Sequence, residues 1–407
     1  MMVPKLRFSE FIKGWQQKKI GDVFTIFSGF AFKSTDATTS GCRWLKIADV
    51  GCQVMTPGTP SFLPNHFSNE YHKFLIRKDD YVIALTRPIL NGKLKISVAG
   101  KEYDGSLLNQ RVGKIVTINN PKFVYSLLQM ESTVSKINNC IAGTDPPNLS
   151  TQDIKDMIVY VPIIEEQIKI ADFMSSVDEK IALLNKQYDL LCQYKKGMMQ
   201  KIFSQEVRFK EDDGSAFPDW ENQKLGDVAV FLKGKGVAKT DVLENGEREC
   251  IRYGELYTDY GEVISKIKSR TNQPLNDSIL SISRDVLIPS SGETAIDISK
   301  ASCVLSDGVI LGGDLNIIRS KVIDGIFLSY YINSQKKYEI AQMAQGNSVV
   351  HLYAKQLAKT EIYYPCKKEQ IKIANFVSAL DDKITTKKAE LDKLKSWKHG
   401  LLQQMFV

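Results

Sequence analysis

The chain contains one sequence plan twice. The segment EQIKIADFMSSVDEKI at 166–181 recurs as EQIKIANFVSALDDKI at 369–384, which is 203 residues later in a chain of 407 residues. The match continues without a gap to Phe203 and Phe406, and 17 of these 38 aligned positions are identical. Solenoid repeats have periods of roughly 20–50 residues. A repeat four times longer therefore indicates a duplicated domain pair.

The start of each copy matches as well. WQQKKIGDV at 15–23 pairs with WENQKLGDV at 220–228, whereas residues 51–140 and 256–343 share spacing but little identity. Three shorter motifs of the first copy also recur in the second: Leu6-Arg7-Phe8 and Val207-Arg208-Phe209, Gly143…Leu149 and Gly346…Leu352, Tyr160-Val161-Pro162 and Tyr363-Tyr364-Pro365. The two copies are therefore expected to share a framework around interiors that differ.

Segment 166–203 has the pattern of one long amphipathic helix. Its apolar residues are spaced by three or four positions, and charged residues lie off this stripe. The stripe and its repeat comprise Ile170, Phe173, Val177, Ile181, Leu184, Tyr188 and Leu191, and Ile373, Phe376, Leu380, Ile384, Leu391 and Leu394. Pro162 precedes the helix, and Glu165 and Glu166 suit its N-terminus. A helix of this length spans roughly 57 Å at about 1.5 Å per residue.

Two such helices in one chain can bury their apolar stripes against each other. We therefore predict an intramolecular antiparallel coiled coil. The alternative is that each helix packs on its own globular domain. Gly197 and Gly400 occupy matching helix positions and cost about 1 kcal/mol each relative to alanine. We expect these glycines to allow close packing or a bend near the helix end.

The rest of each copy has the pattern of mixed α and β structure. Strands are expected at 81–85, 114–118, 286–288 and 316–319, and helices at 123–137 and 326–343. The predicted fold class is α+β: two mixed α/β globular domains joined by two long helices that form an antiparallel coiled-coil spacer, with a pseudo-two-fold internal repeat. The predicted boundaries are 1–162 for the first domain, 163–205 for the first helix, 206–365 for the second domain and 366–407 for the second helix.

Composition narrows the class of protein. Hydrophobic residues make up 43% and charged residues 25% of the chain, which excludes a wholly disordered chain, a collagen and a polytopic membrane protein. The longest apolar stretch, 157–164, is far shorter than the roughly 20 residues of a membrane-spanning helix. The absence of a secretory signal and seven scattered cysteines without a CxxC pair favour a cytoplasmic protein with free thiols. A net charge of +7 permits a nucleic-acid partner but does not demonstrate one.

One motif invites comparison with methyl-transfer chemistry. Asp145-Pro146-Pro147-Asn148 is similar to the D/N-P-P-aromatic loop of amino-methyltransferases, which stacks a flipped base on its aromatic ring. Asn148 stands at the aromatic position, and the matching residues 348–352 carry no trace of the motif. No Gly-rich AdoMet loop follows a predicted strand. The sequence therefore favours a chain without a catalytic site.

The sequence gives equally little support for a metal site. Cys42, Cys52, His66 and His72 have the spacing C-x9-C-x13-H-x5-H, whereas a zinc finger needs about two to four residues between its cysteines. The second copy has no equivalent set. The glycine clusters at 234–236 and 312–313 do not form a P-loop.

Basic residues in turn-rich segments are better candidates for binding. Lysine and arginine can neutralise phosphates, and arginine can read guanine edges. The candidates are Lys33, Arg43, Lys46, Arg87, Lys93, Lys95 and Arg111 in the first copy and Lys233, Lys235, Lys239, Arg252, Arg284 and Lys300 in the second. The turn at 86–93 follows a predicted strand and has a counterpart at 290–294, which favours these two loops over the other basic segments.

Three features together resemble the type I restriction-modification DNA specificity subunits. These are W-x-x-x-K-[IL]-G-D-V at the start of each copy, G-x5-L before Y-x-P-x3-E-Q-I-K-I-A-x-F with its long helix, and the presence of the whole unit twice. The resemblance covers residues 5–406. It implies two target recognition domains, each reading one half of a split DNA sequence, with the long helices as the antiparallel spacer between them. It also implies that the chain is not an enzyme.

The same resemblance implies partners and cofactors. The expected partners are double-stranded DNA, two methyltransferase subunits and restriction (motor-endonuclease) subunits, with no membrane. No cofactor is expected in this chain, because AdoMet, ATP and Mg would lie on the partner subunits, and the methylated base would be an adenine in each half-site. A spacer of ~50 Å exceeds one turn of DNA, about 34–36 Å. We therefore expect a bipartite, asymmetric target.

Site residues follow from these expectations. We expect DNA contacts from Lys33, Lys46, Arg87, Asn91, Lys93, Lys235, Lys239, Arg252, Ser290 and Ser291. We expect contacts with the methyltransferase subunits from the exposed helix faces, at Lys169, Asp172, Lys372 and Asn375.

Other functions remain open at this point. A non-catalytic coiled-coil scaffold with two interaction domains would show no salt-dependent DNA affinity. A methyltransferase acting alone would bind AdoMet and depend on Asp145. An orphan subunit that guides methylation without a restriction partner has the same sequence pattern as a subunit of the full system.

Overall fold

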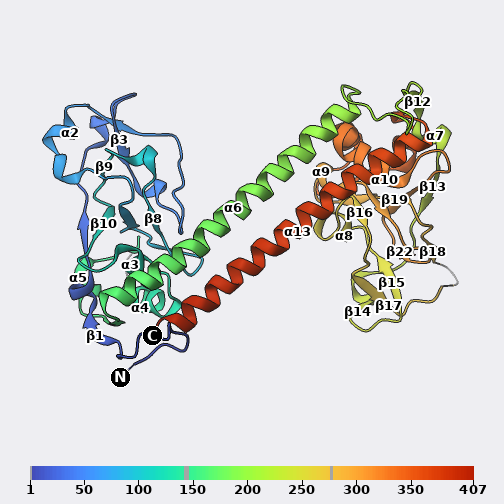
Figure 1. Ribbon diagram of the computed structural model, residues 1–407. Coiled ribbons are helices and arrows are strands. Elements are labelled where there is room, and N and C mark those ends of the chain that lie inside the picture. Colours follow the sequence, from blue (N-terminus) through green and yellow to red (C-terminus); the bar gives the residue numbers. More distant parts are fainter. Residues whose placement is uncertain (1, 142–145, 276–277) are drawn as a thin grey trace. The chain divides into compact units, whose positions relative to one another are not determined.

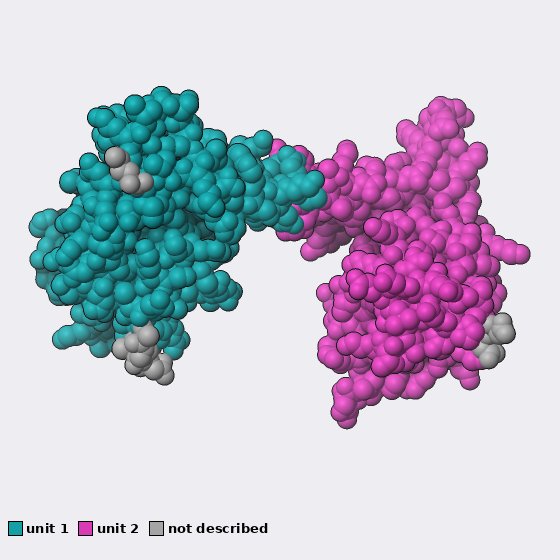
Figure 2. Space-filling model, turned by 90° about the horizontal axis from the view of Figure 1, so that it is seen from below, with its two compact units in different colours: residues 1–185, 389–407 teal, residues 186–388 magenta. Residues whose placement is uncertain are grey.

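The computed structural model describes residues 2–141, 146–275 and 278–407. Its contacts group the chain into two compact units, which Figure 2 colours separately. Unit 1 comprises residues 1–185 and 389–407, and unit 2 comprises residues 186–388. Each unit thus combines one globular part with portions of both long helices. This grouping differs from the four predicted segments, whose boundaries follow the sequence repeat.

Unit 1 is built around an antiparallel four-stranded sheet (Figure 1). Its order is β2 (Thr25–Ser28), β10 (Val112–Val116), β5 (Tyr81–Ala84) and β8 (Ile96–Val98). A smaller sheet contains β4 (Phe62–Leu63), β3 (Cys42–Leu45) and β9 (Leu107–Leu108). The strand predicted at 81–85 is confirmed, and the one predicted at 114–118 begins and ends two residues earlier.

Unit 2 repeats the order of these four strands. Its main sheet runs β13 (Val230–Lys233), β23 (Leu315–Arg319), β19 (Asp285–Pro289), β21 (Ser302–Val304) and β16 (Val263–Ile264). A second sheet runs β14 (Val242–Leu243), β17 (Ser269–Thr271), β15 (Arg248–Ile251), β22 (Ile310–Leu311) and β18 (Ile279–Leu280). The strands predicted at 286–288 and 316–319 are confirmed. The copies therefore share a sheet topology although their interiors differ in sequence.

The matched ends of each copy lie side by side. β1 (Gln16–Lys19) pairs antiparallel with β11 (Ile158–Val161), and β12 (Glu221–Lys224) pairs in the same way with β25 (Glu361–Tyr364). The motif that opens a copy is therefore bonded to the strand that leads into its long helix. This pairing explains why the two motifs recur together.

The shorter predicted helices are interrupted. The helix predicted at 123–137 is two helices, α3 (Pro121–Leu127) and α4 (Glu131–Ile141). At Gln129 and Met130 the backbone N–H groups bond to the third preceding carbonyl rather than the fourth, which ends α3 without a glycine or proline. Its counterpart, predicted at 326–343, is confirmed as α10 (Gly325–Tyr331) and α11 (Lys337–Met343), joined by a π-helical turn.

Two helices are much longer than the rest: α6 (Ile164–Phe203) and α13 (Lys367–Met405). They confirm the helix predicted at 166–203 and its repeat. In unit 2, the Lys388 Nζ lies 5.7 Å from the Tyr188 ring centroid. The Lys195 Nζ lies 2.6 Å from an Asp381 carboxylate oxygen. One residue number rises as the other falls, so the helices run antiparallel there. In the described part of the chain, no helix is long and apolar enough to cross a membrane.

The helix ends lie in the hydrophobic cores. The Phe406 ring, just after α13, lies 6.0 Å from Trp15 and 5.2 Å from Phe123 in unit 1. The Phe203 ring, at the end of α6, lies 5.8 Å from Phe327 in unit 2. Each helix therefore packs at its start on its own copy and at its end on the other copy. The alternative that each helix packs on its own globular domain therefore holds for the start of each helix and not for its end.

The matching helix glycines have open surroundings. A Cβ atom built on Gly197 or on Gly400 would meet no heavy atom within 4 Å. Of the two expectations for these glycines, close packing or a bend, close packing is therefore wrong among the described residues.

Candidate nucleic-acid interface

The two predicted reading loops occupy equivalent places in the units. In unit 1, Leu85 O at the end of β5 accepts a hydrogen bond from Leu149 N at 2.6 Å, and Thr86 Oγ donates to Asn148 Oδ1 at 2.6 Å. In unit 2, Ser290 O after β19 accepts a hydrogen bond from Leu352 N at 3.0 Å. Both loops thus leave a central strand and pair with the segment that precedes the last strand of their copy.

Arg87 begins the exposed part of the loop in unit 1. Its φ of +46° lies in the left-handed region, where a side chain with a Cβ is strained. The backbone N–H of Arg87 donates to Pro147 O at 2.7 Å, and this bond holds the residue in place. The guanidinium is exposed. Strained backbone of this kind clusters at functional sites.

A tight hairpin follows. Strands β6 (Ile89–Leu90) and β7 (Lys93–Leu94) are joined by Asn91 and Gly92, with φ values of +49° and +72°. Positive φ at both central residues is the conformation that Asn-Gly hairpin turns adopt. The turn presents Asn91 and Lys93 to solvent.

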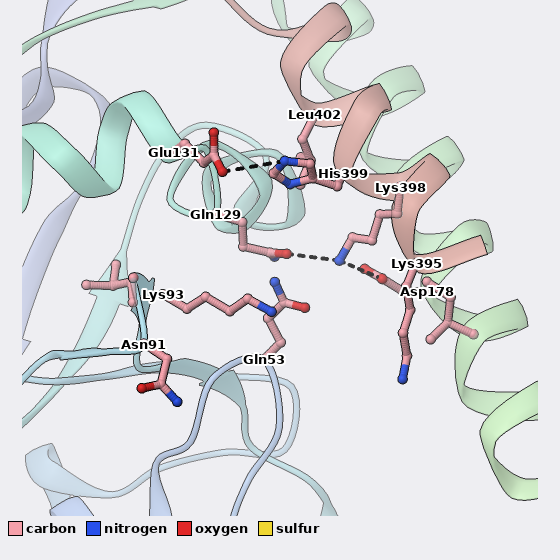
Figure 3. Close-up of a pocket in the computed structure, with 13 residues that line it drawn as sticks. Gln53, Asn91, Lys93, Gln129, Glu131, Asp178, Lys395, Lys398, His399 and Leu402 are labelled. Carbon is pink, nitrogen blue, oxygen red and sulfur yellow. Dashed lines mark hydrogen bonds and ion pairs between the residues drawn. The ribbon is translucent and has the colours of Figure 1, made fainter. Parts of the chain in front are cut away.

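The hairpin lines one side of a cavity of about 430 Å³ in unit 1, and the end of α13 lines another (Figure 3). The Lys398 ammonium points into it, is only 7% exposed, and lies 2.7 Å from Asp178 Oδ1 and 2.9 Å from Gln129 Oε1. His399 Nε2 lies 3.5 Å from Glu131 Oε1 at the rim. The remaining lining residues are Gln53, Asn91, Gly92, Lys93, Leu94, Ile181, Lys395 and Leu402.

The other predicted DNA contacts of unit 1 are Lys33 and Lys46, and Lys46 lies near the hairpin, because the Lys95 Nζ donates to Ile47 O at 3.3 Å. Lys33 is exposed, and its backbone N–H donates to Asp36 Oδ2 at 2.8 Å at the start of a short 3-10 helix. Lys46 is half-buried, with its Nζ 3.9 Å from the Trp44 ring centroid in a cation–π contact. Both lysines directly precede short 3-10 helices, Ser34–Asp36 and Ile47–Asp49, but Lys33 is the more exposed of the two.

In unit 2 the predicted basic contacts are spread over two turns. Lys235 and Lys239 are exposed and flank the bend at Val237, which has a φ of +54°. Arg252 is half-buried, and its backbone N–H donates to Glu255 Oε2 at 3.2 Å. Backbone hydrogen bonds of residues 312–314 link these turns to the loop after β19: Gly312 N donates to Ile251 O, Gly313 N donates to Gly236 O, and Asp314 O accepts from Ser290 N.

The two predicted serines differ in exposure. Ser290 lines a cavity of about 420 Å³ with Lys233, His351, Tyr353 and others. Ser291 is 6% exposed, because it lies in β20 (Ser291–Gly292) and pairs with His351. A direct base contact from Ser291 is at odds with this burial, whereas the rim of the cavity offers exposed polar groups that the sequence pattern missed.

The residues predicted to contact the partner subunits also differ in their surroundings. Lys169 forms an ion pair with Glu10, and the Lys372 Nζ lies 2.6 Å from Asp212 Oδ1. Both lysines are thus paired with the segment that opens their own copy. Asp172 and Asn375 are exposed.

Two buried carboxylates were missed by reasoning from the sequence. Glu166 accepts hydrogen bonds from Arg7 Nε and Nη2, both at 2.7 Å, and from Trp15 Nε1 at 3.2 Å. Glu369 accepts from Arg208 Nη2 at 2.7 Å in the second copy. Each carboxylate holds the pKa of its arginine above the usual value, mainly through the hydrogen bond.

The neighbouring glutamines have a similar role. Gln167 Nε2 donates to Pro162 O at 2.9 Å, and Gln370 Nε2 donates to Pro365 O at 2.8 Å. The repeated E-Q pair therefore fastens the start of each long helix to the globular part of its copy. The signal that points to this role is the repeated Leu6-Arg7-Phe8 motif, which supplies the arginine.

The two cysteines that were weak candidates for a zinc site have different surroundings. Cys42 Sγ contacts Gly105 O at 3.2 Å, and Cys52 Sγ lies 3.8 Å from Lys93 O. Among the described residues, no three His, Cys, Asp or Glu side chains are grouped so that they could hold a metal ion. Asp145 lies outside the described residues.

Comparison with known proteins identifies the family. The profile described as "Type I restriction modification DNA specificity domain" matches residues 12–192 and 218–396. The chain belongs to this family. The two matched regions coincide with the two copies of the repeat, so the resemblance to type I restriction-modification specificity subunits is confirmed.

Curated relatives support the assignment over part of their length. The MjaVIII specificity subunit of Methanocaldococcus jannaschii is 30% identical over 209 residues, covering 51% of this chain and 49% of that protein. The EcoAI specificity subunit of Escherichia coli is 29% identical over 181 residues, covering 44% and 30%. The chain thus spans about half the length of MjaVIII and less of EcoAI.

Solved structures confirm the fold. The specificity subunit from M. genitalium superimposes with a TM-score of 0.66 at 18% identity, covering 100% of this chain and 99% of that one. A chain from work on complex assembly and conformational transition of the type I R-M system gives 0.53 at 17% identity, covering 98% of each. At these identities the likeness concerns the fold alone.

Proposed function

We propose that the chain is the DNA specificity subunit of a type I restriction-modification complex and reads a bipartite, asymmetric target. The observation that carries the proposal is the match of one specificity profile to both copies, whose frameworks agree while their interiors differ. Two domains of one fold with different loops would dock on DNA alike and read different bases. The reading loops would be those after β5 and β19.

The long helices would serve as an antiparallel coiled-coil spacer. At about 1.5 Å per residue, a helix of 40 residues such as α6 is ~60 Å long. One DNA turn is about 34–36 Å. The two domains would therefore contact half-sites separated by base pairs that neither touches.

The chain would act without a catalytic site of its own. Methylation of an adenine in each half-site would be performed by two methyltransferase subunits with AdoMet, and cleavage by restriction subunits with ATP and Mg. Equivalent exposed residues support two copies of one partner: Ile168 is 44% exposed and Ile371 40%, at matching helix positions. Asp172 and Asn375 lie one turn further along and would join these contacts.

A methylation map tests the proposal. The chain is expressed with its cognate methyltransferase subunit in a host free of adenine methylation, the genome is sequenced for modified adenines, and the control omits this chain. A gapped, two-part motif found only with the chain is the expected result. Absent or unchanged methylation from an intact complex would favour the non-catalytic scaffold.

A domain exchange tests the two reading heads separately. Residues 1–145 are replaced by the corresponding part of another family member, and the methylated motif is mapped again. One half-site should change while the other stays. A change in both halves would contradict modular reading. A motif methylated with no restriction partner encoded in the source genome would identify an orphan methylation-guiding subunit.

A further inference from the structure

The cavity of unit 1 carries an excess of positive charge, because three lysines and two carboxylates line it. Among its lining residues in the described structure, Lys398 is paired with Asp178 and His399 with Glu131. Lys93 from the hairpin and Lys395 from α13 are exposed lysines that form no ion pair with the described carboxylates. Lys93 and Lys395 thus line one cavity from separate elements, together with the buried Lys398.

The second copy provides an internal comparison. Lys195 is the counterpart of Lys398, and its Nζ lies 2.6 Å from Asp381 and 3.7 Å from Glu262. It is therefore bounded by two carboxylates, whereas Lys398 has one carboxylate and a neutral amide. Cys192 stands at the position equivalent to Lys395. The uncompensated charge is a property of unit 1 and does not follow from the shared framework.

We propose that this cavity binds a phosphodiester group of the target DNA, with Lys93 and Lys395 as its ligands, while Lys398, paired with Asp178, forms part of the cavity wall. The inference rests on the proposed function and deepens it, because Lys93 of the loop after β5 would act together with residues at the end of α13. Lysine binds phosphate as a point charge. A volume of about 430 Å³ has room for a phosphate with its sugar. A phosphate held beside the Asn91 turn would fix the register of the loop on the duplex, because backbone contacts position and base contacts specify.

The proposal has a consequence for the two copies. Lys395 belongs by sequence to the second copy, yet it lies in unit 1. The affinity for the first half-site would then depend on α13 as well as on the first recognition domain. The contact would be independent of base sequence, since a phosphate carries no sequence information.

The test measures how DNA affinity depends on salt. The full chain, in complex with its methyltransferase subunit, is titrated with the duplex found by methylation mapping and with a scrambled duplex. Each lost phosphate contact lowers the slope of log K against log salt by about 0.9. Because both lysines would hold the same phosphate, Lys93→Gln and Lys395→Gln should each lower it by part of this amount, and the double variant by about 0.9 in all. The preference for target over scrambled duplex should stay unchanged.

Lys393→Gln is the matched control, because this lysine is exposed on the same helix two residues away and does not line the cavity. Its slope should equal that of the wild type. An equal loss in the control, or an unchanged slope in the double variant, would overturn the phosphate site while leaving DNA reading intact. Circular dichroism verifies folding, which substitutions of exposed lysines should preserve.

A second measurement separates DNA from a free phosphate compound as the occupant. Inorganic phosphate and dAMP are added to the wild type and the double variant, and Tm is compared. No shift in either is expected. A shift in the wild type alone, with unchanged DNA slopes, would overturn the DNA assignment in favour of a small phosphate ligand. A wild-type complex that binds no duplex would overturn both the proposed function and this site.

Discussion

Replacing Phe406 by alanine should detach the end of α13 from unit 1. The Phe406 side chain is 3% exposed and contacts the rings of Trp15 and Phe123, which also contact each other. Leu401, Leu402 and Met405 are buried in the same core. Loss of the phenyl ring leaves a cavity in a core formed by three chain segments that are far apart in sequence, so relaxation of one segment cannot fill it.

The magnitude follows from large-to-small substitutions in cores. A buried Phe→Ala change costs about 3–5 kcal/mol. Aromatic pairs of this geometry contribute about 0.5–1.5 kcal/mol of that loss. With a urea slope of about 2–3 kcal/mol per molar, a loss of about 4 kcal/mol lowers the midpoint for unit 1 by about 1.5–2 M.

Tryptophan fluorescence during urea unfolding measures this shift. Three of the four tryptophans, Trp15, Trp44 and Trp397, lie in unit 1 and report its transition. Gln404→Ala is the control, because this exposed side chain precedes Phe406 by two residues. A Phe406→Ala midpoint within about 0.3 M of the control would refute the packing argument, since it would correspond to less than about 1 kcal/mol.

Three further outcomes are expected. Gly400→Ala should raise the stability of unit 1 by about 1 kcal/mol in the same urea assay, because the added methyl group meets open space; destabilisation would mean that the helix needs glycine there. Arg7→Met should cost about 3 kcal/mol, because it leaves the Glu166 carboxylate buried and unpaired, and a double-mutant cycle with Glu166→Gln should recover part of the loss; strict additivity would argue against the pair. Burial raises the pKa of Cys250 to about 11 and also raises that of Cys303, so both thiols should resist iodoacetamide at neutral pH until the chain is denatured; mass spectrometry of the labelled peptides checks this, and rapid labelling of either in the folded chain would contradict it.

Local periodicity predicts the long helices because it depends only on residues that are close together in the sequence. The predicted start of the first long helix, residue 166, is only two residues after the observed start of α6 at Ile164. The break between α3 and α4 is different, because it depends on how Leu128 and Met130 both reach the core. No glycine or proline marks it.

The candidate site is predictable only in part. The repeat draws attention to the loop that contains Arg87 and Lys93. The Arg7–Glu166 pair joins residues 159 positions apart, and Glu166 has the ordinary appearance of a helix N-terminal acid. The place of Lys395 is harder to predict. Its sequence neighbours assign it to the second copy, whereas the residue lies in unit 1. Long-range partners of this kind follow from the fold and not from spacing.

The contact between the end of α13 and unit 1 also bears on the order of synthesis. Unit 2 is one continuous stretch, 186–388, whereas unit 1 is completed by residues 389–407. During translation, unit 2 has all its residues before unit 1 does, although unit 1 begins first. The core around the Trp15 and Phe123 rings is incomplete until Phe406 has been added. A nascent chain without residues 401–406 would thus hold unit 2 whole while the core of unit 1 stays open.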